Sequence, residues 1–203
     1  SMFDKESLQF VAAVVLAGLC GCFGVRTGNV EEVKYVDAFN LSAASCGMGK
    51  RVMACKSVDG HPLTMSGKVY EHGFGAHPES AVAFTSNGGK LAFDAVVGID
   101  ADAELLGAGK EGHGGQPSVI FNVWADGRIA WTSPVLRNGM QPVAVHVDLK
   151  GAKEIVLETS SDAPWVAFEA CNGDWLDARF TCADGAKIES VSDPAETAQL
   201  GIL

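Results

Sequence analysis

The sequence predicts an all-β protein, an antiparallel β-sandwich, and three observations support this fold class. The 203 residues include 24 glycines, enough for many tight turns between short elements. Roughly eight to ten short apolar or alternating runs recur about every 8–15 residues, a spacing typical of sandwich strands. No long run has the periodicity of an amphipathic helix. An apolar fraction of 47% provides for a core within one domain and its flanking segments.

The strands predicted in the first half of the chain are short apolar runs between Gly, Pro, Ser and Asn clusters. They cover residues 69–70, 81–84 and 91–99. The segment 101–117 is the longest interruption, and it is rich in glycine and charge. Long loops on a rigid sandwich often carry function, so this segment is of interest for binding.

The second half of the chain contains the clearest strand signals. Residues 118–124 and 128–131 flank Asp126-Gly127, which predicts a hairpin because both turn positions tolerate positive φ. Residues 142–149 alternate between apolar and polar, as in a half-buried strand of an antiparallel sheet, and His146 falls on the polar face. Three further strands are predicted at 154–158, 165–168 and 175–180.

The ends of the chain differ in composition from its middle. Residues 8–25 are almost wholly apolar, and the dense part, Phe10 to Leu19, matches a signal-peptide core rather than a membrane span. We therefore predict export to a secreted, periplasmic or cell-surface location. A buried element of the domain and a retained anchor are the alternatives. The predicted organisation is a leader and linker over 1–34, the sandwich over 35–185 and a linker toward a following domain over 186–203.

Charge excludes two classes of partner. Lys and Arg number 15 against 25 Asp and Glu, a net charge of −10. Nucleic-acid binding needs a basic surface to displace counterions, and docking on anionic lipid needs basic residues as well. We expect no nucleic-acid partner, and no membrane partner beyond an N-terminal signal or lipid anchor.

The cysteines leave two interpretations open. They stand at positions 20, 22, 46, 55, 171 and 182, and no CxxC motif is present, which argues against a zinc ribbon. If the leader is removed, four cysteines remain, and their three possible pairings cannot be separated by sequence. Four buried free thiols are the alternative.

The sequence lacks the common catalytic motifs. There is no GxSxG elbow, Walker loop or HExxH motif. Asp174 and Asp177 lie three residues apart, so on a strand they would point to opposite faces rather than flank one sugar. An enzyme would need two carboxylates across a groove, such as Glu111 and Asp174. We predict that this chain is not itself an enzyme.

A sugar site needs an aromatic face and a few fixed polar groups, and two segments offer them. Residues 169–179 (EACNGDWLDAR) contain Trp175 for stacking, with Asn172 and Asp174 for hydrogen bonds. A core position is the alternative for Trp175, and the role of Trp165 is left open.

The second segment, residues 70–77 (YEHGFGAH), contributes Tyr70 and His77 as further candidate sugar-binding residues. Gly73 and Gly75 would permit close approach of the backbone to a ligand.

A calcium site is the metal site that the sequence favours. Asp100, Asp102, Asp174 and Asp177 lie near loop ends, and calcium binds oxygen donors of this kind. We single out Asp100 and Asp177 as candidate ligands, with solvated carboxylates as the alternative.

Six short motifs in order make the chain similar to the NPCBM family, which overlaps carbohydrate-binding module family 51. They are SVDG (57–60), YEHGFGAH (70–77), VGID (97–100), the Asp126-Gly127 hairpin, residues 145–151 and DWLDA (174–178). The resemblance covers about residues 35 to 183. It implies a galactose-binding-like jelly roll, often with a structural calcium ion, appended to a secreted glycoside hydrolase. It also implies recognition of galactose, N-acetylgalactosamine or blood-group glycans.

Within this resemblance, His77 matches the histidine of the family's GxGxH motif and Trp175 the tryptophan of its DW motif. The chain departs from the family at Cys171-Asn172, where an Asp-His pair is common, and at Pro78. Residues 199–203 (QLGIL) resemble the segment that leads into family 27 α-galactosidases. The expected function is a non-catalytic module that recognises galactose or N-acetylgalactosamine and targets an attached hydrolase. The alternative is a structural module that packs on the catalytic domain without binding sugar.

Overall fold

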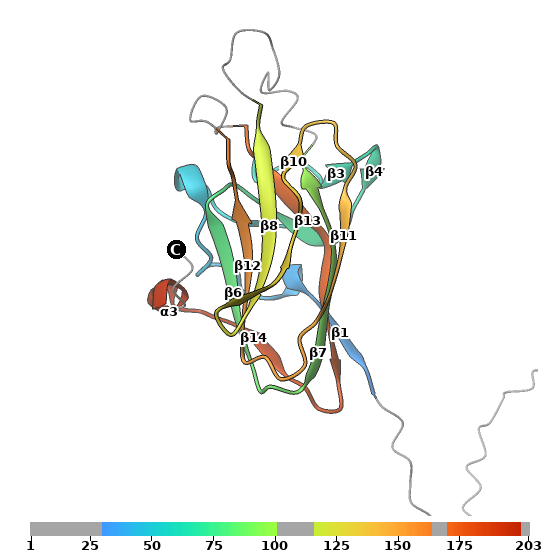
Figure 1. Ribbon diagram of the computed structural model, residues 1–203, viewed down its shortest axis with the longest axis vertical. Helices are drawn as coiled ribbons and strands as arrows, with labels where there is room; N and C mark the ends of the chain where they lie inside the picture. The colour runs from blue at the N-terminus through green and yellow to red at the C-terminus, as the bar shows by residue number, and fades with distance from the viewer. Residues whose placement is uncertain (1–29, 101–115, 164–169, 200–203) are drawn as a thin grey trace, which may run out of the picture.

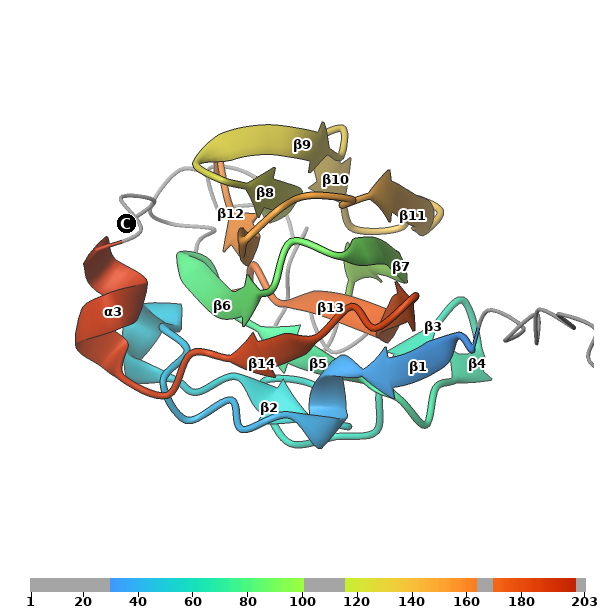
Figure 2. The same cartoon turned by 90° about the horizontal axis from the view of Figure 1, so that it is seen from below.

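The computed structural model describes residues 30–100, 116–163 and 170–199. Its strands form two six-stranded sheets that face each other (Figures 1 and 2), with every strand pair antiparallel. The all-β, antiparallel sandwich that the sequence predicts is therefore confirmed.

Sheet A has the order β11–β7–β13–β5–β2, and β1 pairs with the second half of β13. Its strands are β1 (Glu32–Tyr35), β2 (Met53–Ala54), β5 (Gly73–Ala76), β7 (Lys90–Ile99), β11 (Val143–Asp148) and β13 (Gly173–Ala183). Sheet B has the order β10–β8–β12–β6–β14, and β9 pairs with β8. Its strands are β6 (Ser80–Ser86), β8 (Ser118–Ala125), β9 (Arg128–Thr132), β10 (Leu136–Arg137), β12 (Glu154–Ser160) and β14 (Ile188–Ser190).

Small elements join and cover the sheets. The hairpin of β3 (Thr64–Met65) and β4 (Lys68–Val69) lies in the connection between β2 and β5. Two short 3-10 helices, η1 (Val36–Ala38) and η2 (Gly47–Gly49), precede it. The helix α3 (Pro194–Gln199) lies beside β6 (Figure 2). In the described parts of the chain, no helix is long and apolar enough to cross a membrane.

The predicted hairpin and the alternating strand are both confirmed. Asp126 and Gly127 have φ of 49° and 72°, so the two-residue turn between β8 and β9 uses the positive φ that this pair tolerates. In β11, Val145 and Val147 are buried, whereas His146 on the other face is exposed.

The core lies between the sheets and is strongly aromatic. Its largest fully buried side chains include Trp175, Phe74, Phe84, Phe93, Phe121 and Phe180. Trp175 contacts the rings of Phe74, Phe93 and Phe121 at centroid distances of 5.9, 5.9 and 5.2 Å. Its Nε1–H donates to Oγ1 of Thr159 on the opposite sheet, at 2.9 Å. This residue therefore ties the two sheets together.

The predicted domain limits of 35 and 185 are too narrow at both ends. Strand β1 begins at Glu32 and pairs with β13, and β14 pairs with β6 and buries Ile188. The charged segment before Tyr35 suggested a linker, but an edge strand tolerates charged residues. Residues 1–29, most of the long loop at 101–117 and the predicted strand at 165–168 lie outside the described residues.

The four cysteines after the apolar leader carry free thiols rather than disulfides, but the alternative of four buried thiols is confirmed only in part, because two of them are buried. Cys171 and Cys182 are buried, Cys46 is partly buried and Cys55 is exposed. Burial raises the pKa of each of these thiols, so they remain largely protonated at neutral pH. Cys20 and Cys22 lie outside the described residues.

Candidate functional site

One end of the sandwich brings together four of the predicted site residues. Strands β5 and β7 end there and β13 begins there, because Gly173 pairs with both Ala76 and Ile99. We call this the apical end; it is the upper end in Figure 1, where β8 begins. The four residues are His77, Asp100, Asn172 and Asp174, which follow or open these strands.

All four of these side chains are at most 2% exposed. Asn172 lies between neighbouring segments: its backbone carbonyl accepts from the Asp100 N–H at 3.0 Å. The Nδ1 atom of His77 lies at hydrogen-bond distance from the carbonyl oxygen of Pro78. The predicted direct contacts between these side chains and a ligand are therefore not available at the surface that the described residues form.

Gly75 explains why Asp174 is buried. Asp174 pairs with Gly75 on one side and with Gly98 on the other. A Cβ atom at Gly75 would lie 2.4 Å from the backbone nitrogen of Val58, so the segment at residues 57–58 crosses directly over the strand. The close backbone approach predicted for the glycines is thus made by the protein's own chain rather than by a ligand.

Among the described residues, a partly exposed ion pair lies at the apical end and is hydrogen-bonded by the buried Asn172 side chain. Nζ of Lys50 donates to Oδ1 of Asp59 at 2.8 Å, and Nδ2 of Asn172 donates to the other oxygen at 2.6 Å. The Lys50 and Asp59 side chains are 28% and 29% exposed. Burial opposes ionisation of Asp59, but the bonds from Lys50 and Asn172 outweigh it and hold its pKa below the ordinary value.

Sequence reasoning did not single out Lys50 or Asp59 as site residues. Asp59 belongs to the SVDG motif, which is the signal that could have found it. Asn172 lies 113 positions away from Asp59, and no local pattern predicts their contact. Lys50 lies in the loop after η2 and offers no signal of its own.

Trp175 is not a sugar platform. Its side chain is 0% exposed and both its ring and its N–H are engaged in the core, so the alternative of a core tryptophan is correct. The physical reason is strand alternation: Asp174 faces the covered outer side of sheet A, and its neighbour Trp175 consequently faces the other sheet.

Tyr70 and Asp177 lie away from the apical group. Tyr70 is half-buried and packs against the small apolar cluster of Leu63, Met65 and Leu176. Nζ of Lys68 lies 4.0 Å from the Tyr70 ring centre and 4.0 Å from Oδ2 of Asp177. Both residues therefore belong to the flank of sheet A, near the β3–β4 hairpin.

Asp100 and Asp177 do not share one metal ion. Asp100 lies beside Asn172, whereas Asp177 is five positions further along, at the irregularity in β13, which is on the order of 15 Å away at strand spacing. Among the described residues, no group of three or more His, Cys, Asp or Glu side chains is placed to hold a metal ion. Asp100 and Asp177 therefore do not form one site, and calcium binding at either residue stays a prediction.

Comparison with known proteins adds a family and several solved relatives of the fold. The NPCBM/NEW2 domain matches residues 32–181. A Renibacterium salmoninarum protein named as an endo-alpha-N-acetylgalactosaminidase is 33% identical over 129 residues, which are 62% of this chain and 8% of that protein. The chain thus spans a small part of the length of this curated relative.

Three of the similar solved structures come from Clostridium perfringens. The ZmpB structure with the M60 catalytic domain, CBM51-1 and CBM51-2 has 25% identity and a TM-score of 0.62, covering 75% of this chain and 15% of that one. CBM51-2 with GlcNAc has 24% identity and a TM-score of 0.63, covering 76% and 32%. The GH95 CBM51 with methyl-galactose has 22% identity and a TM-score of 0.60, covering 73% and 99%.

The matched segment begins at the first residue of β1 and ends within β13, so it takes in most of both sheets. The shared architecture and the extent of the match agree with the motifs found in the sequence. On these grounds the chain belongs to the NPCBM/NEW2 domain family.

Proposed function

We propose that this chain is a non-catalytic carbohydrate-binding module that recognises galactose- or N-acetylgalactosamine-type terminal sugars for an attached glycoside hydrolase. Membership of the family supports the module assignment. The similar CBM51 solved with methyl-galactose and the similar protein named as an endo-alpha-N-acetylgalactosaminidase support a galactose-type ligand. The similar CBM51-2 solved with GlcNAc supports sugar binding in general. The attached enzyme acts on the same class of glycan, and its origin in family 27 stays a prediction. Such glycans lie outside the cell, which supports export of the module.

The observation that carries this proposal is the exposed Lys50–Asp59 pair held from below by Asn172. An ionised carboxylate with a fixed orientation accepts hydrogen bonds from sugar hydroxyls, and the adjacent ammonium donates to them. Because Asn172 and Lys50 already hold Asp59 in place, little side-chain entropy is lost when a ligand binds. The buried predicted residues around Asn172 thus act as support for this surface.

A structural module without a sugar site is the second candidate function. The burial of Trp175, His77, Asn172 and Asp174 favours it, because these were the residues predicted to touch a ligand. In that case the sandwich would pack on the hydrolase, and calorimetric titration with sugars would show no heat of binding.

Calorimetric titration with galactose, N-acetylgalactosamine, N-acetylglucosamine and glucose tests the proposal. We expect saturable binding of a galactose-type sugar with a Kd of about 0.1–1 mM. Asp59→Ala removes the oriented acceptor, so it should weaken binding by at least about tenfold, or about 1.4 kcal/mol. Repeating the titration with calcium present and with calcium chelated tests the predicted ion.

The matched control is Asp94→Ala. Asp94 is also a carboxylate paired with a basic side chain, His146, but it lies on the open face of sheet A. This variant should bind sugar as the original chain does. Absence of heat with every sugar at millimolar concentration, with the chain folded, would reject the binding module and favour the structural one.

A further inference from the structure

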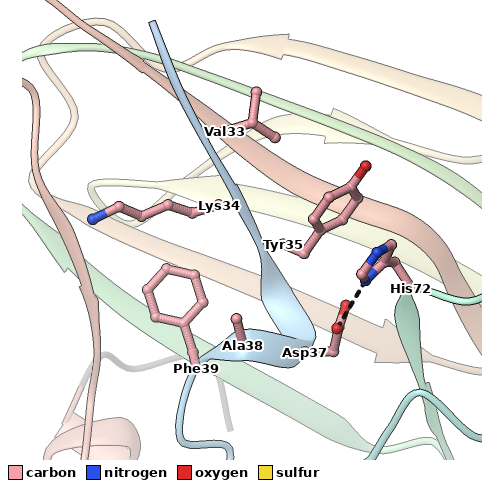
Figure 3. A pocket seen from close by; sticks show the side chains of 7 residues that line it. All are labelled: Val33, Lys34, Tyr35, Asp37, Ala38, Phe39 and His72. Carbon is pink, nitrogen blue, oxygen red and sulfur yellow. Dashed lines mark hydrogen bonds and ion pairs between the residues drawn. The ribbon is translucent and has the colours of Figure 1, made fainter. Parts of the chain in front are cut away.

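A second candidate site lies on the flank of the sandwich, in a cavity of about 410 Å³. None of the residues that line it is among the sugar-binding residues predicted from the sequence. It is lined by Val33, Lys34, Tyr35, Asp37, Ala38, Phe39 and His72. Figure 3 shows Phe39 on one side of the hollow and Tyr35 with His72 on the other, with Ala38 between them. His72 and His77 stand at opposite ends of β5, so this flank cavity is on the order of 15 Å from the apical end.

The polar part of the flank cavity is built around Asp37. This carboxylate, whose side chain is only 8% exposed, accepts from Nδ1 of His72 at 3.1 Å and from the backbone N–H of Gly73 at 2.9 Å. The Cys55 thiol donates to it at 3.3 Å. Burial would raise the pKa of Asp37, but these hydrogen bonds outweigh burial and hold its pKa below the ordinary value.

The result is an imidazole held in one orientation. Because ionised Asp37 accepts the Nδ1–H of His72, the Nε2 atom of the neutral ring is left as a hydrogen-bond acceptor. The ring also stacks on Tyr35, with centroids 3.7 Å apart and an interplanar angle of 14°. The His72 side chain is nevertheless 41% exposed. Because the hydrogen bond to Asp37 and the stacking on Tyr35 already fix this surface histidine, it loses little rotamer freedom when a ligand binds.

The volume, the apolar lining and the charge of the flank cavity indicate the class of ligand that it would bind. The volume lies in the lower part of the range of about 300–1,000 Å³ for small-molecule sites, which suits a single sugar ring rather than a chain. Phe39, Ala38 and Val33 provide apolar walls for the C–H faces of a sugar. The Lys34 ammonium lies 3.6 Å from the Glu32 carboxylate, so the two carboxylates of Glu32 and Asp37 outnumber this one ammonium in and beside the cavity. A negative site of this kind disfavours an acidic sugar.

We propose that the flank cavity is a second carbohydrate-binding site that takes one neutral pyranose residue, with Nε2 of His72 accepting from a sugar hydroxyl. This inference rests on the proposed function. Two sites on one module would engage two glycan ends of a dense surface together, and the second contact would be intramolecular. The module would then stay bound to a glycan-rich surface even though each site alone has low affinity.

The test is a titration of the ¹⁵N-labelled chain with N-acetylgalactosamine, galactose and glucuronic acid, followed by amide shifts. We expect the neutral sugars to move two separate sets of amides, one at Tyr35, Ala38 and Gly73 and one at Asp59 and Gly60. Ala38→Leu fills the hollow from an exposed position and keeps the Asp37–His72 bond. It should weaken the flank response at least tenfold while leaving the apical response unchanged.

Two further variants complete the design. His72→Phe keeps a ring for stacking but lacks Nε2, so it should also lose the flank response; Ala38→Leu decides the matter if this variant folds poorly. His146→Phe is the matched control, because His146 makes the same bond to Asp94, at 2.8 Å, on a face that does not line the cavity. It should change neither set.

Each outcome decides a different point. Apical shifts without flank shifts would overturn the second site alone, as would a full flank response in Ala38→Leu. An absence of shifts in both sets would overturn the proposed function together with the second site. A stronger flank response to glucuronic acid than to the neutral sugars would overturn the neutral ligand class.

Discussion

Replacing Trp175 with alanine is expected to destabilise the domain by about 3–5 kcal/mol, the usual cost of removing a large buried aromatic side chain. The ring is fully buried and contacts three phenylalanines that come from both sheets. The substitution would leave a cavity between the sheets and would also deprive the buried Thr159 hydroxyl of its donor. Since whole domains are stable by only about 5–15 kcal/mol, this loss is a large share of the total.

Urea unfolding of the two proteins measures this effect, and Trp175→Phe is the control. Phenylalanine keeps most of the ring volume and loses the N–H, so its cost should be clearly smaller. The opposite pattern would contradict the structural role: unchanged stability in Trp175→Ala, combined with loss of sugar binding, would return Trp175 to the ligand site.

Replacing Gly73 with alanine is the second substitution with a large expected effect, about 3 kcal/mol or more. Gly73 has a φ of 128°, which side chains rarely adopt, and a Cβ atom there would lie 2.1 Å from the backbone oxygen of Trp175. The neighbour is backbone in the centre of sheet A and cannot rotate away. The variant must therefore move β5 away from β13, and it would also strain the bond from the Gly73 N–H to Asp37.

Gly139→Ala is the control, because it introduces backbone strain without a steric overlap between a new Cβ atom and the neighbouring backbone. Gly139 also has positive φ, 78°, but a Cβ atom there meets no heavy atom within 4 Å. We expect it to lose only about 1 kcal/mol. Thermal and urea unfolding of both variants measure the difference, and equal losses would show that the contact with Trp175 does not matter.

Local patterns were sufficient for much of the fold. The alternation of residues 143–148 predicted which side chains of β11 are buried, because one face of that strand meets the core and the other meets solvent. The Asp126-Gly127 turn was equally readable, since its two positive φ values depend on residues that are adjacent in the chain. The ordered motifs then identified the family that the match over residues 32–181 shows.

The site could be predicted only in part, because burial at the apical end depends on contacts between distant segments. His77, Asn172 and Asp174 lie at the same end of sheet A, but the chain that crosses Gly75 covers this end. The side chain of Asn172 binds Asp59, which is far away in the sequence. The flank cavity likewise combines residues 33–39 with His72, which follows β4.

The sequence by itself determined the fold class, the hairpin and the family, because each depends on short-range patterns of residues. The tertiary structure alone decided that Trp175 belongs to the core and that β1 belongs to sheet A. It also decided that Asp100 and Asp177 lie apart. The physical reason is that a strand in a sandwich has two faces, and which of them is covered depends on segments that are far away in the chain.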